Sequence, residues 1–496
     1  MNSSIKRILA LATAVATLAA TLAACDETDI TAETETARIT EALTAEETVT
    51  RIPTDLPDYD WNGYNFKILT KGEAGSEWDI SVARDIAAEE ETGEVFNDAI
   101  FYRNRNLDER YNFTIEHLKY PLGGENDPIL SAVLAGDDYF DAASLAQYHA
   151  VGLAKEGLFV NLLTMKHLDL EKPWWDQGLI KNATLSEKLF FISGDSVLIN
   201  RDSTTVMLFN KGLIEDYGLE NPYELVRNNK WTVPKFSEMA AAAAADLNGD
   251  HKMDYEIDRY GYISSMSSGL STGAGLRYSE IDAEGQPVLT FAGDRNYRII
   301  AALHDIYYSD YTWLTGGGYS LLGVSPSTSE PEEMFAAGRG LFFSALIRSV
   351  ENLRGAEVNF GIIPVPKFDE DQKEWGHSSS GFFGDFLCVP NLGDKYTLER
   401  TGFVLEALTL ESHYTTIPAW YDVQLTTKFA RDAESKEMLD IVFSSIVWDP
   451  YTIYGWGDFN PMQSAANGRL ASAWASGLRK TEIEMRETIK MFDKID

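Results

Sequence analysis

Residues 127–145, DPILSAVLAGDDYFDAASL, combine a helix pattern with a strand pattern and decide the fold class. Pro128 stands near the start of the expected helix and Gly136 near its end, which are positions that these residues favour. The apolar run YFDAASL that follows predicts a strand. Three upstream segments complete the pattern, namely a strand at 64–72, a helix at 93–111 and a strand at 111–118. Strand, helix, strand, helix, strand is typical of a parallel α/β sheet.

In open sheets of this kind, ligands meet the loops at the carboxyl ends of the strands. Two such loops are expected here, residues 71–80 with Trp78 and Asp79, and residues 146–149 with Gln147 and Tyr148.

The rest of the chain predicts a second α/β region. Thr232 is an expected N-cap for a helix that contains an alanine run. The last hundred residues are expected to be mostly helical and are rich in tyrosine and tryptophan. Further strands are expected at 188–195, 204–210, 259–266, 341–349, 358–366 and 384–390.

The N-terminus has the pattern of a secreted lipoprotein. Lys6 and Arg7 precede an apolar run, residues 8–20, that is too short for a comfortable membrane span. The following Leu-Ala-Ala-Cys resembles the bacterial lipoprotein cleavage box, which implies a signal peptide at 1–24 and lipidation of Cys25, for example with palmitate. The alternative is a buried N-terminal helix with an incidental core cysteine. Residues 25–57 are acidic and poor in apolar side chains, so we expect a disordered tether there.

Composition narrows the function classes. The formal net charge is −35, of which the signal and tether leave about −30 for the body, and such a surface disfavours nucleic acid and anionic lipid as partners. No later segment reaches eighteen consecutive apolar residues. Cys388 is the only cysteine after Cys25, so the mature body cannot form an internal disulfide, and two cysteines with seven scattered histidines supply no zinc or iron–sulfur ligand set.

Five stretches, taken in order, resemble the extracellular solute-binding proteins of ABC transporters, and more narrowly the sugar-binding family that includes maltose-binding protein. They are AGDDYFDAASLAQYHAVGLAKEGLFVNLL (135–163), VMLFNKGLIEDYGLENPYE (206–224), WTVPKFSEMAAAAA (231–244), MFAAGRGLFFSA (334–345) and VNFGIIPVPKFD (358–369). No single motif is specific, and their order over roughly residues 60 to 450 carries the resemblance.

The resemblance implies two α/β lobes, each a sheet flanked by helices, joined by crossing strands that act as a hinge. It places 58–200 and 346–390 in lobe 1 and 201–345 and 391–496 in lobe 2, with crossings near 195–205, 341–348 and 387–392. It further implies a monomer that binds a carbohydrate between the lobes and delivers it to ABC permease subunits. Such a protein needs no cofactor and catalyses no reaction. It would lie outside the cell, on the outer face of the cytoplasmic membrane, held there only by its lipid.

Sugars require aromatic platforms and polar side chains at their edges. Trp78 and Tyr148 are the candidate platforms, with Asp79 and Gln147 as hydrogen-bonding neighbours. Three further candidates, each with its alternative, are Asp202 (a solvated hinge residue), Arg348 (a surface ion pair) and Phe383 (a core residue). We interpret PWWD (173–176) and Trp231 as packing residues.

The stretch DLNGDHKMD (246–254) resembles a calcium loop of the EF-hand type. Position 6 is His251 where glycine is expected, and position 12 is Ile257 rather than glutamate. The alternative is a polar turn that caps the alanine-rich helix, and calcium would be structural. The candidate ligands at positions 1, 3, 5, 7 and 9 are Asp246, Asn248, Asp250, the carbonyl of Lys252, and Asp254.

Two other functions stay open at this point. A secreted glycoside-active enzyme would use a pair of carboxylates, but no pair is marked by its context. A lipoprotein that senses a ligand and reports to a membrane kinase would have the same sequence features as a transport protein.

Overall fold

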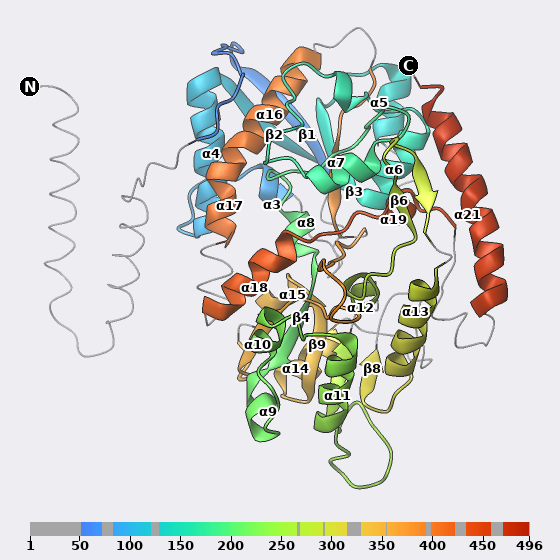
Figure 1. Ribbon diagram of the computed structural model, residues 1–496. Helices are drawn as coiled ribbons and strands as arrows, with labels where there is room; N and C mark the ends of the chain where they lie inside the picture. Colours follow the sequence, from blue (N-terminus) through green and yellow to red (C-terminus); the bar gives the residue numbers. More distant parts are fainter. Residues whose placement is uncertain are drawn as a thin grey trace, which may run out of the picture. The chain divides into compact units, whose positions relative to one another are not determined.

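The computed structural model describes residues 51–71, 83–120, 128–264, 268–290, 293–314, 329–353, 355–381, 383–392, 398–421, 433–457 and 470–495. The chain divides into two units, Met1–Asp55 and Leu56–Asp496. The second unit contains two main sheets, each with its own covering of helices (Figure 1). Within the described ranges, no helix is both long enough and apolar enough to span a bilayer.

The first sheet has four strands in the order β11-β3-β1-β2. Strands β1, β2 and β3 run parallel to one another, whereas β11 is antiparallel to β3. The parallel arrangement that the sequence predicted for the first three strands is therefore confirmed. The strands are β1 (Tyr64–Lys71), β2 (Phe113–Tyr120), β3 (Ala142–Ala146) and β11 (Asp385–Cys388).

Small apolar residues explain why β3 is central. Its sequence AASLA is buried throughout, because neighbouring strands flank it and helices cover it. The carboxyl end of β3 passes directly into helix α6, so Gln147 begins that helix. The helices of this lobe are α3 (Ala83–Ile86), α4 (Val95–Tyr111), α5 (Pro128–Ala135), α6 (Gln147–Lys155), α7 (Gln177–Ala183), α16 (Leu398–Tyr414), α17 (Thr416–Pro418) and α19 (Pro450–Tyr454).

The second sheet has five strands in the order β10-β4-β9-β5-β8. Alternate residues of β4 enter different apolar clusters, Met207 and Phe209 on one face and Val206 and Leu208 on the other. Both faces are therefore covered, as the period-two alternation of a strand requires. The strands are β4 (Thr205–Asn210), β5 (Tyr260–Ser264), β8 (Thr312–Leu314), β9 (Gly340–Leu346) and β10 (Phe360–Ile363).

Helices and a hairpin complete the second half of the body. Strands β6 (Ser279–Ile281) and β7 (Pro287–Leu289) form a separate antiparallel hairpin. Helix α21 (Leu470–Phe492) ends the described chain. The remaining helices are α8 (Ile199–Asp202), α9 (Lys211–Asp216), α10 (Pro222–Arg227), α11 (Val233–Ala243), α12 (Ser268–Gly273), α13 (Asp294–Tyr307), α14 (Ser329–Ala336), α15 (Ser349–Asn352) and α18 (Ala433–Phe443).

The lobe boundaries differ from those expected. After β9 the chain does not cross, because Val350 and Leu353 pack in the same cluster as β4, and β10 then pairs with β4. Helix α16, which was expected in the second lobe, buries Phe403 in the core of the first. The first crossing lies between Ile199 and Met207, which agrees with the expected range of 195–205. The next lies between β10 and β11, which belong to different sheets. Phe403, Met438 and Trp448 then belong alternately to the first and second cores, so the two lobes share the chain in more segments than predicted.

Residues 188–195, expected to be a strand, form only isolated bridges, which pair Lys188 with Leu185, Ile192 with Leu387 and Gly194 with Trp175. A Cβ atom on Gly194 would lie 2.6 Å from the carbonyl oxygen of Trp174. The backbone approaches this closely because the segment packs under the buried tryptophans rather than extending into a ladder.

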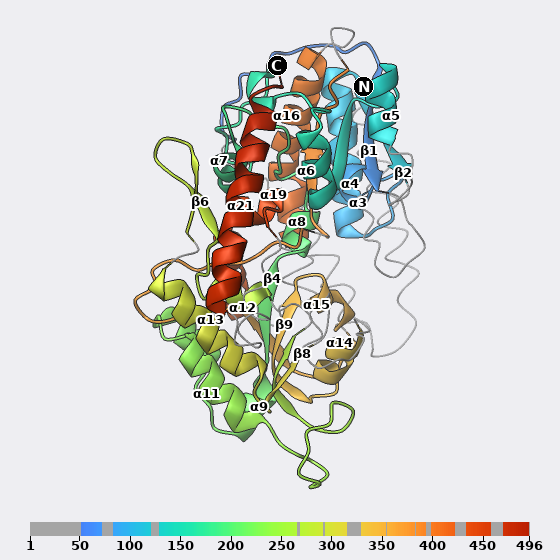
Figure 2. The same ribbon diagram turned by 90° about the vertical axis from the view of Figure 1, so that its right-hand side faces the viewer.

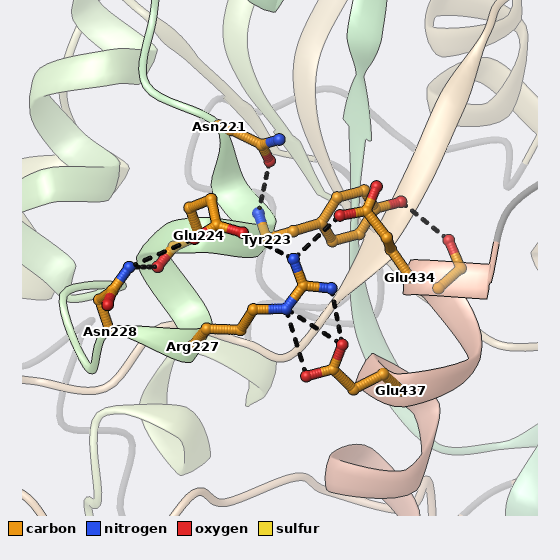
Figure 3. A network of polar contacts seen from close by, with 8 residues as sticks. Asn221, Tyr223, Glu224, Arg227, Asn228, Glu434 and Glu437 are labelled. Atoms are coloured by element: carbon orange, nitrogen blue, oxygen red, sulfur yellow. Dashed lines mark hydrogen bonds and ion pairs between the residues drawn. The ribbon is translucent and has the colours of Figure 1, made fainter.

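Helix α18 is fastened to α10 at the surface of the second lobe. Arg227 donates hydrogen bonds to Glu224 (2.7 Å), Glu434 (3.0 Å) and Glu437 (2.7 Å), so one guanidinium holds three carboxylates (Figure 3). Beneath it, the hydroxyl groups of Tyr223 and Ser435 are 2.9 Å apart. The pair fixes α18 where it re-enters the second lobe.

Candidate functional site

Three segments that are far apart in sequence meet where the chain passes between the sheets, and we call them the hinge cluster: residues 199–205, 346–349 and 377–384. The Arg348 amide donates to the Asp202 carbonyl (3.0 Å), and the Ile347 amide donates to the Thr204 carbonyl (3.0 Å). The Ser380 amide donates to the Ser203 carbonyl (3.0 Å). Backbone hydrogen bonds therefore hold the three segments side by side.

Asp202 is the buried charged residue of this cluster. Its carboxylate accepts hydrogen bonds from the guanidinium of Arg84 and from the indole nitrogen of Trp420 (3.1 Å). These donors come from α3 in the first lobe and from the residues just after α17, so Asp202 joins three parts of the chain. Its side chain is only 10% exposed, and the ion pair with Arg84 supplies the partner that a buried charge requires.

Arg84 contacts a second acid, Asp85. Burial raises the pKa of Asp85 to about 6 despite the neighbouring guanidinium, and the Ile199 amide donates to its carboxylate at 2.8 Å. Burial lowers the pKa of Arg84, but the pull of Asp202 and then Asp85 outweighs it, so the net shift is upward and the guanidinium stays charged. The ion pairs of Arg84 with Asp85 and Asp202 connect α3 to the first crossing.

A side-chain network connects the carboxyl end of β3 to the hinge cluster. The Gln147 amide nitrogen donates to Asn200 Oδ1 (3.1 Å), which also accepts from the Asp385 amide (2.9 Å). Asn200 in turn donates to the Asp385 carbonyl (2.7 Å). A Cβ atom on Gly384 would lie 2.4 Å from Asn200 Oδ1 and 2.5 Å from Gln147 Nε2, so only glycine fits there.

Arg348 and Phe383 form a cation–π pair within the hinge cluster. The guanidinium carbon lies 4.6 Å from the ring centroid, within the range of a cation–π contact. Both side chains are half-buried. Tyr148 follows Gln147 on α6 and is 55% exposed.

The sequence-predicted residues lie in three kinds of position: in or bonded to the hinge cluster, beside it, or outside the described residues. Gln147, Asp202, Arg348 and Phe383 belong to the hinge cluster or bond to it, and Tyr148 is adjacent and exposed. Ligand binding by these residues stays a prediction. Trp78, Asp79 and Cys25 lie outside the described residues.

Sequence reasoning missed Arg84, Asn200 and Asp385. Asp385 is fully buried and Asn200 is 5% exposed. The only available signal was the position of Asp385 directly before an apolar strand, and nothing in the sequence indicated that it would pair with the segment that holds Asn200.

The tryptophans interpreted as packing residues are buried. The indole nitrogens of Trp174 and Trp175 donate to Glu406 at 2.9 and 2.8 Å, and the Asp169 amide donates to the same carboxylate at 3.0 Å. Trp231 is fully buried, and its indole donates to the Pro364 carbonyl (2.8 Å). The packing interpretation of these side chains is confirmed.

In the acidic loop, the expected ligands accept hydrogen bonds from the loop itself. Asp246 accepts from the amides of Gly249 and His251, each at 2.7 Å. His251 adopts φ +65°, the left-handed conformation that glycine would supply at that position. Asn248, Asp250 and Asp254 each accept from the amide two residues further on (2.9 Å). In the part of the chain that the structure covers, no group of three or more histidine, cysteine, aspartate or glutamate side chains is arranged to hold a metal ion.

No protein-family model matches the sequence, and no curated protein matches it. Solved structures do match. The ABC substrate-binding protein Lmo0181 of Listeria monocytogenes, in complex with cycloalternan, is 13% identical, with a TM-score of 0.51 over 86% of this chain and 99% of that one. The cyclic α-maltosyl-1,6-maltose binding protein of Arthrobacter globiformis is 12% identical, with a TM-score of 0.52 over 85% and 98%. UspC of M. tuberculosis is 12% identical, with a TM-score of 0.51 over 82% and 100%.

At these identities the likeness concerns the fold. Two sheets flanked by helices, joined by segments that cross between them, were expected from the resemblance, and the matches extend over nearly the whole length of each solved structure. The chain therefore has the two-lobed α/β fold of the ABC-transporter solute-binding proteins.

Proposed function

We propose that this chain is a solute-binding lipoprotein that captures a carbohydrate between its two lobes and delivers it to an ABC permease. The supporting observation is the hinge cluster, at which the carboxyl end of β3 and the segments between the sheets meet. Two of the structures that share the fold carry cyclic oligosaccharides in their names. Binding without chemistry suits this site, because its buried acid Asp202 is already held by Arg84 and Trp420.

The side chains around the hinge cluster have the chemistry that a sugar requires. Tyr148 and Phe383 offer aromatic faces, and Arg348 offers hydrogen-bond donors beside Phe383. Asp202 is a buried hinge residue, so the proposed contacts rest mainly on Tyr148, Arg348 and Phe383.

A matched pair of tyrosines tests the placement of the site. Tyr148 lies just after the carboxyl end of β3, and Tyr139 lies just before its amino end, with 55% and 47% of their surfaces exposed. In calorimetric titrations with mono- and oligosaccharides, we expect Tyr148→Ala to weaken binding about tenfold, because one stacking face is lost. Tyr139→Ala should leave the affinity unchanged.

A thermal-shift screen of the same saccharides tests the ligand class, since a bound ligand raises the melting temperature by mass action. If peptides or polyamines raise it and no sugar does, the carbohydrate proposal fails. Release of cleaved product from an oligosaccharide would favour the enzyme alternative instead.

The anchor and the permease are separate parts of the proposal. Replacement of Cys25 by serine should abolish incorporation of labelled palmitate and move the chain from the membrane fraction to the medium. Uptake of the sugar identified in the screen should require the permease genes, in cells with the anchored chain and in cells with the Cys25→Ser chain alike.

Calcium in the loop of residues 246–254 stays a prediction. If the loop binds the ion, calcium should raise the melting temperature and EDTA should lower it, and Asp250→Asn should abolish the difference. An unchanged melting temperature with EDTA would contradict the hypothesis.

A further inference from the structure

Helix α21 has its two halves in different lobes. Its first half lies beside α13, and its second half lies along the helices of the four-stranded sheet (Figure 2). The apolar clusters agree with the picture, because Trp474 belongs to the core of the second lobe and Phe492 to the core of the first. A helix of 23 residues spans about 35 Å, enough to reach from one lobe to the other.

The first half is held by an aromatic stack. The Trp474 ring lies 4.5 Å from the Tyr297 ring on α13, with an angle of 20° between the planes. Trp474 is 3% exposed, and Leu478 packs against the same cluster one turn further along. The stack and this apolar packing attach the first half of the helix to the second lobe.

The second half is held by hydrogen bonds as well as apolar contact. The Trp456 indole donates to Thr488 Oγ1 (2.9 Å), and Lys188 Nζ donates to the Phe492 carbonyl (3.0 Å). Phe492 is fully buried, with its ring 4.7 Å from the ring of Phe190. This end is fixed in the first lobe.

The hairpin β6–β7 makes a second contact of the same kind. Asp449, the N-cap of α19 in the first lobe, accepts from the Tyr278 amide (2.7 Å) and from the Ser279 hydroxyl (2.7 Å). The base of the hairpin is bound to the second lobe, because Asn296 on α13 donates to the Arg277 carbonyl (3.0 Å). The hairpin therefore also has one attachment in each lobe.

We propose that α21 and the hairpin β6–β7 form a latch that restrains rotation of one lobe against the other, in addition to the hinge cluster. Hinge motion relies on a few backbone positions that absorb the change. A packed helix with one end in each lobe opposes that motion unless one end detaches or slides. The stack of Trp474 on Tyr297 is a contact of this helix with the second lobe, and its removal should loosen that end. This proposal rests on the fold and not on the identity of the ligand.

The test measures the distance between the lobes in the absence of ligand. Spin labels are placed on cysteines that replace Asn106 on α4 and Glu215 on α9, which are exposed positions, in the full chain with Cys25→Ser. Cys388 is fully buried and should remain unlabelled. Double electron–electron resonance then gives the distance distribution for the parent chain, for Trp474→Ala and for a control on the same helix, Ile483→Ala, whose side chain is 48% exposed.

We expect Trp474→Ala to broaden the distribution, and Trp474→Phe and Ile483→Ala to leave it as in the parent. If Trp474→Ala does not fold, Tyr297→Ala removes the same stack from the opposite side and decides the question. A distribution for a folded Trp474→Ala or Tyr297→Ala variant that coincides with that of Ile483→Ala would overturn the latch. Because no sugar is present, failure here is distinct from failure of the carbohydrate proposal.

Discussion

The cores of the two lobes and the hinge cluster between them are stabilised in different ways. Each core is built from buried apolar side chains that recur at strand or helix spacing within each contributing segment. The hinge cluster has polar members, and its contacts join chain segments about 140 to 180 residues apart. The cores supply stability through buried area, whereas the hinge cluster fixes geometry through a small number of directed hydrogen bonds.

The largest effect should come from a core. Trp231→Ala removes a fully buried indole and leaves the Pro364 carbonyl without its donor, so we expect a loss of about 3–5 kcal/mol in the free energy of unfolding. Urea titration followed by circular dichroism measures it. Trp231→Phe is the control and should retain much of the stability. A loss below about 1 kcal/mol for the alanine variant would show that this core does not dominate, because such values are typical of surface positions.

A hinge substitution should cost less stability but alter the geometry more. Asp202→Ala removes the acceptor of the Trp420 indole and one of the two acids that pair with Arg84. We expect a loss of about 1–3 kcal/mol in the free energy of unfolding, since Arg84 is 34% exposed and retains Asp85, and water partly replaces the pairing. The interlobe distance distribution should broaden, which Trp231→Phe should not cause. Asp202→Asn retains one acceptor for Trp420 and should fall between. If the interlobe distance distribution of Asp202→Ala equals that of the parent chain, the hinge cluster does not fix the geometry of the lobes and the distinction from the cores fails.

Two buried titratable groups, one in a lobe core and one at a crossing, should give the stability opposite dependences on pH. Burial raises the pKa of Glu406, in the first lobe, to about 7, so its contribution to stability is present below pH 4.5 and is lost as pH rises through 7. Burial lowers the pKa of His377, at the crossing, to about 3, so its contribution is present above pH 6.5 and is lost as pH falls towards 3. His377 accepts from the Val365 amide (3.1 Å), which requires the neutral ring.

The two dependences oppose each other between about pH 4.5 and 6.5, and substitution should separate them. Glu406→Gln should abolish the decline in melting temperature on the alkaline side and expose the acid-side loss due to His377. Glu156→Gln, at an exposed position just after α6 in the same lobe, is the control. Parallel melting-temperature profiles for Glu406→Gln and the parent would contradict the assignment.

The smallest effect should come from the exposed ion pairs by which Arg227 on α10 holds α18. Arg227 pairs with three glutamates that are 41–57% exposed, so Arg227→Ala should cost less stability than either substitution above. The loss should shrink further at high salt, because screening weakens exposed pairs. A loss that is independent of salt and as large as that of Asp202→Ala would mean that these ion pairs contribute like the hinge cluster and not like exposed pairs.

The sequence predicted best those features that depend on local pattern. The strands at 64–72, 111–118 and 139–145 and the helix after Pro128 are confirmed, because strand periodicity and helix-end residues are properties of single segments. The lobe boundaries failed after residue 346. Apolar content showed that β10 and α16 would be buried, but it could not show which lobe would bury them.

The candidate site was partly predictable for the same reason. Gln147 and Tyr148 were selected because they directly follow a strand, and Arg348 and Phe383 because they lie near apolar strands; the structure places all four in or beside the hinge cluster, and their contact with a ligand stays a prediction. Asn200 and Asp385 were missed because their role comes from a hydrogen bond across 185 residues. The close fit of Gly384 between Asn200 and Gln147 is visible only once those partners are in place.

The shared use of the chain by the two lobes also sets the order in which they can be completed. The core of the first lobe includes Phe66 near its start, Leu387 on β11 and Phe492 close to the C-terminus. A polypeptide that emerges N-terminus first therefore cannot finish this lobe until nearly all of it has been released, whereas most of the second lobe is already available. Long-range contacts of this kind slow folding, and here they keep the first lobe incomplete until synthesis is almost over.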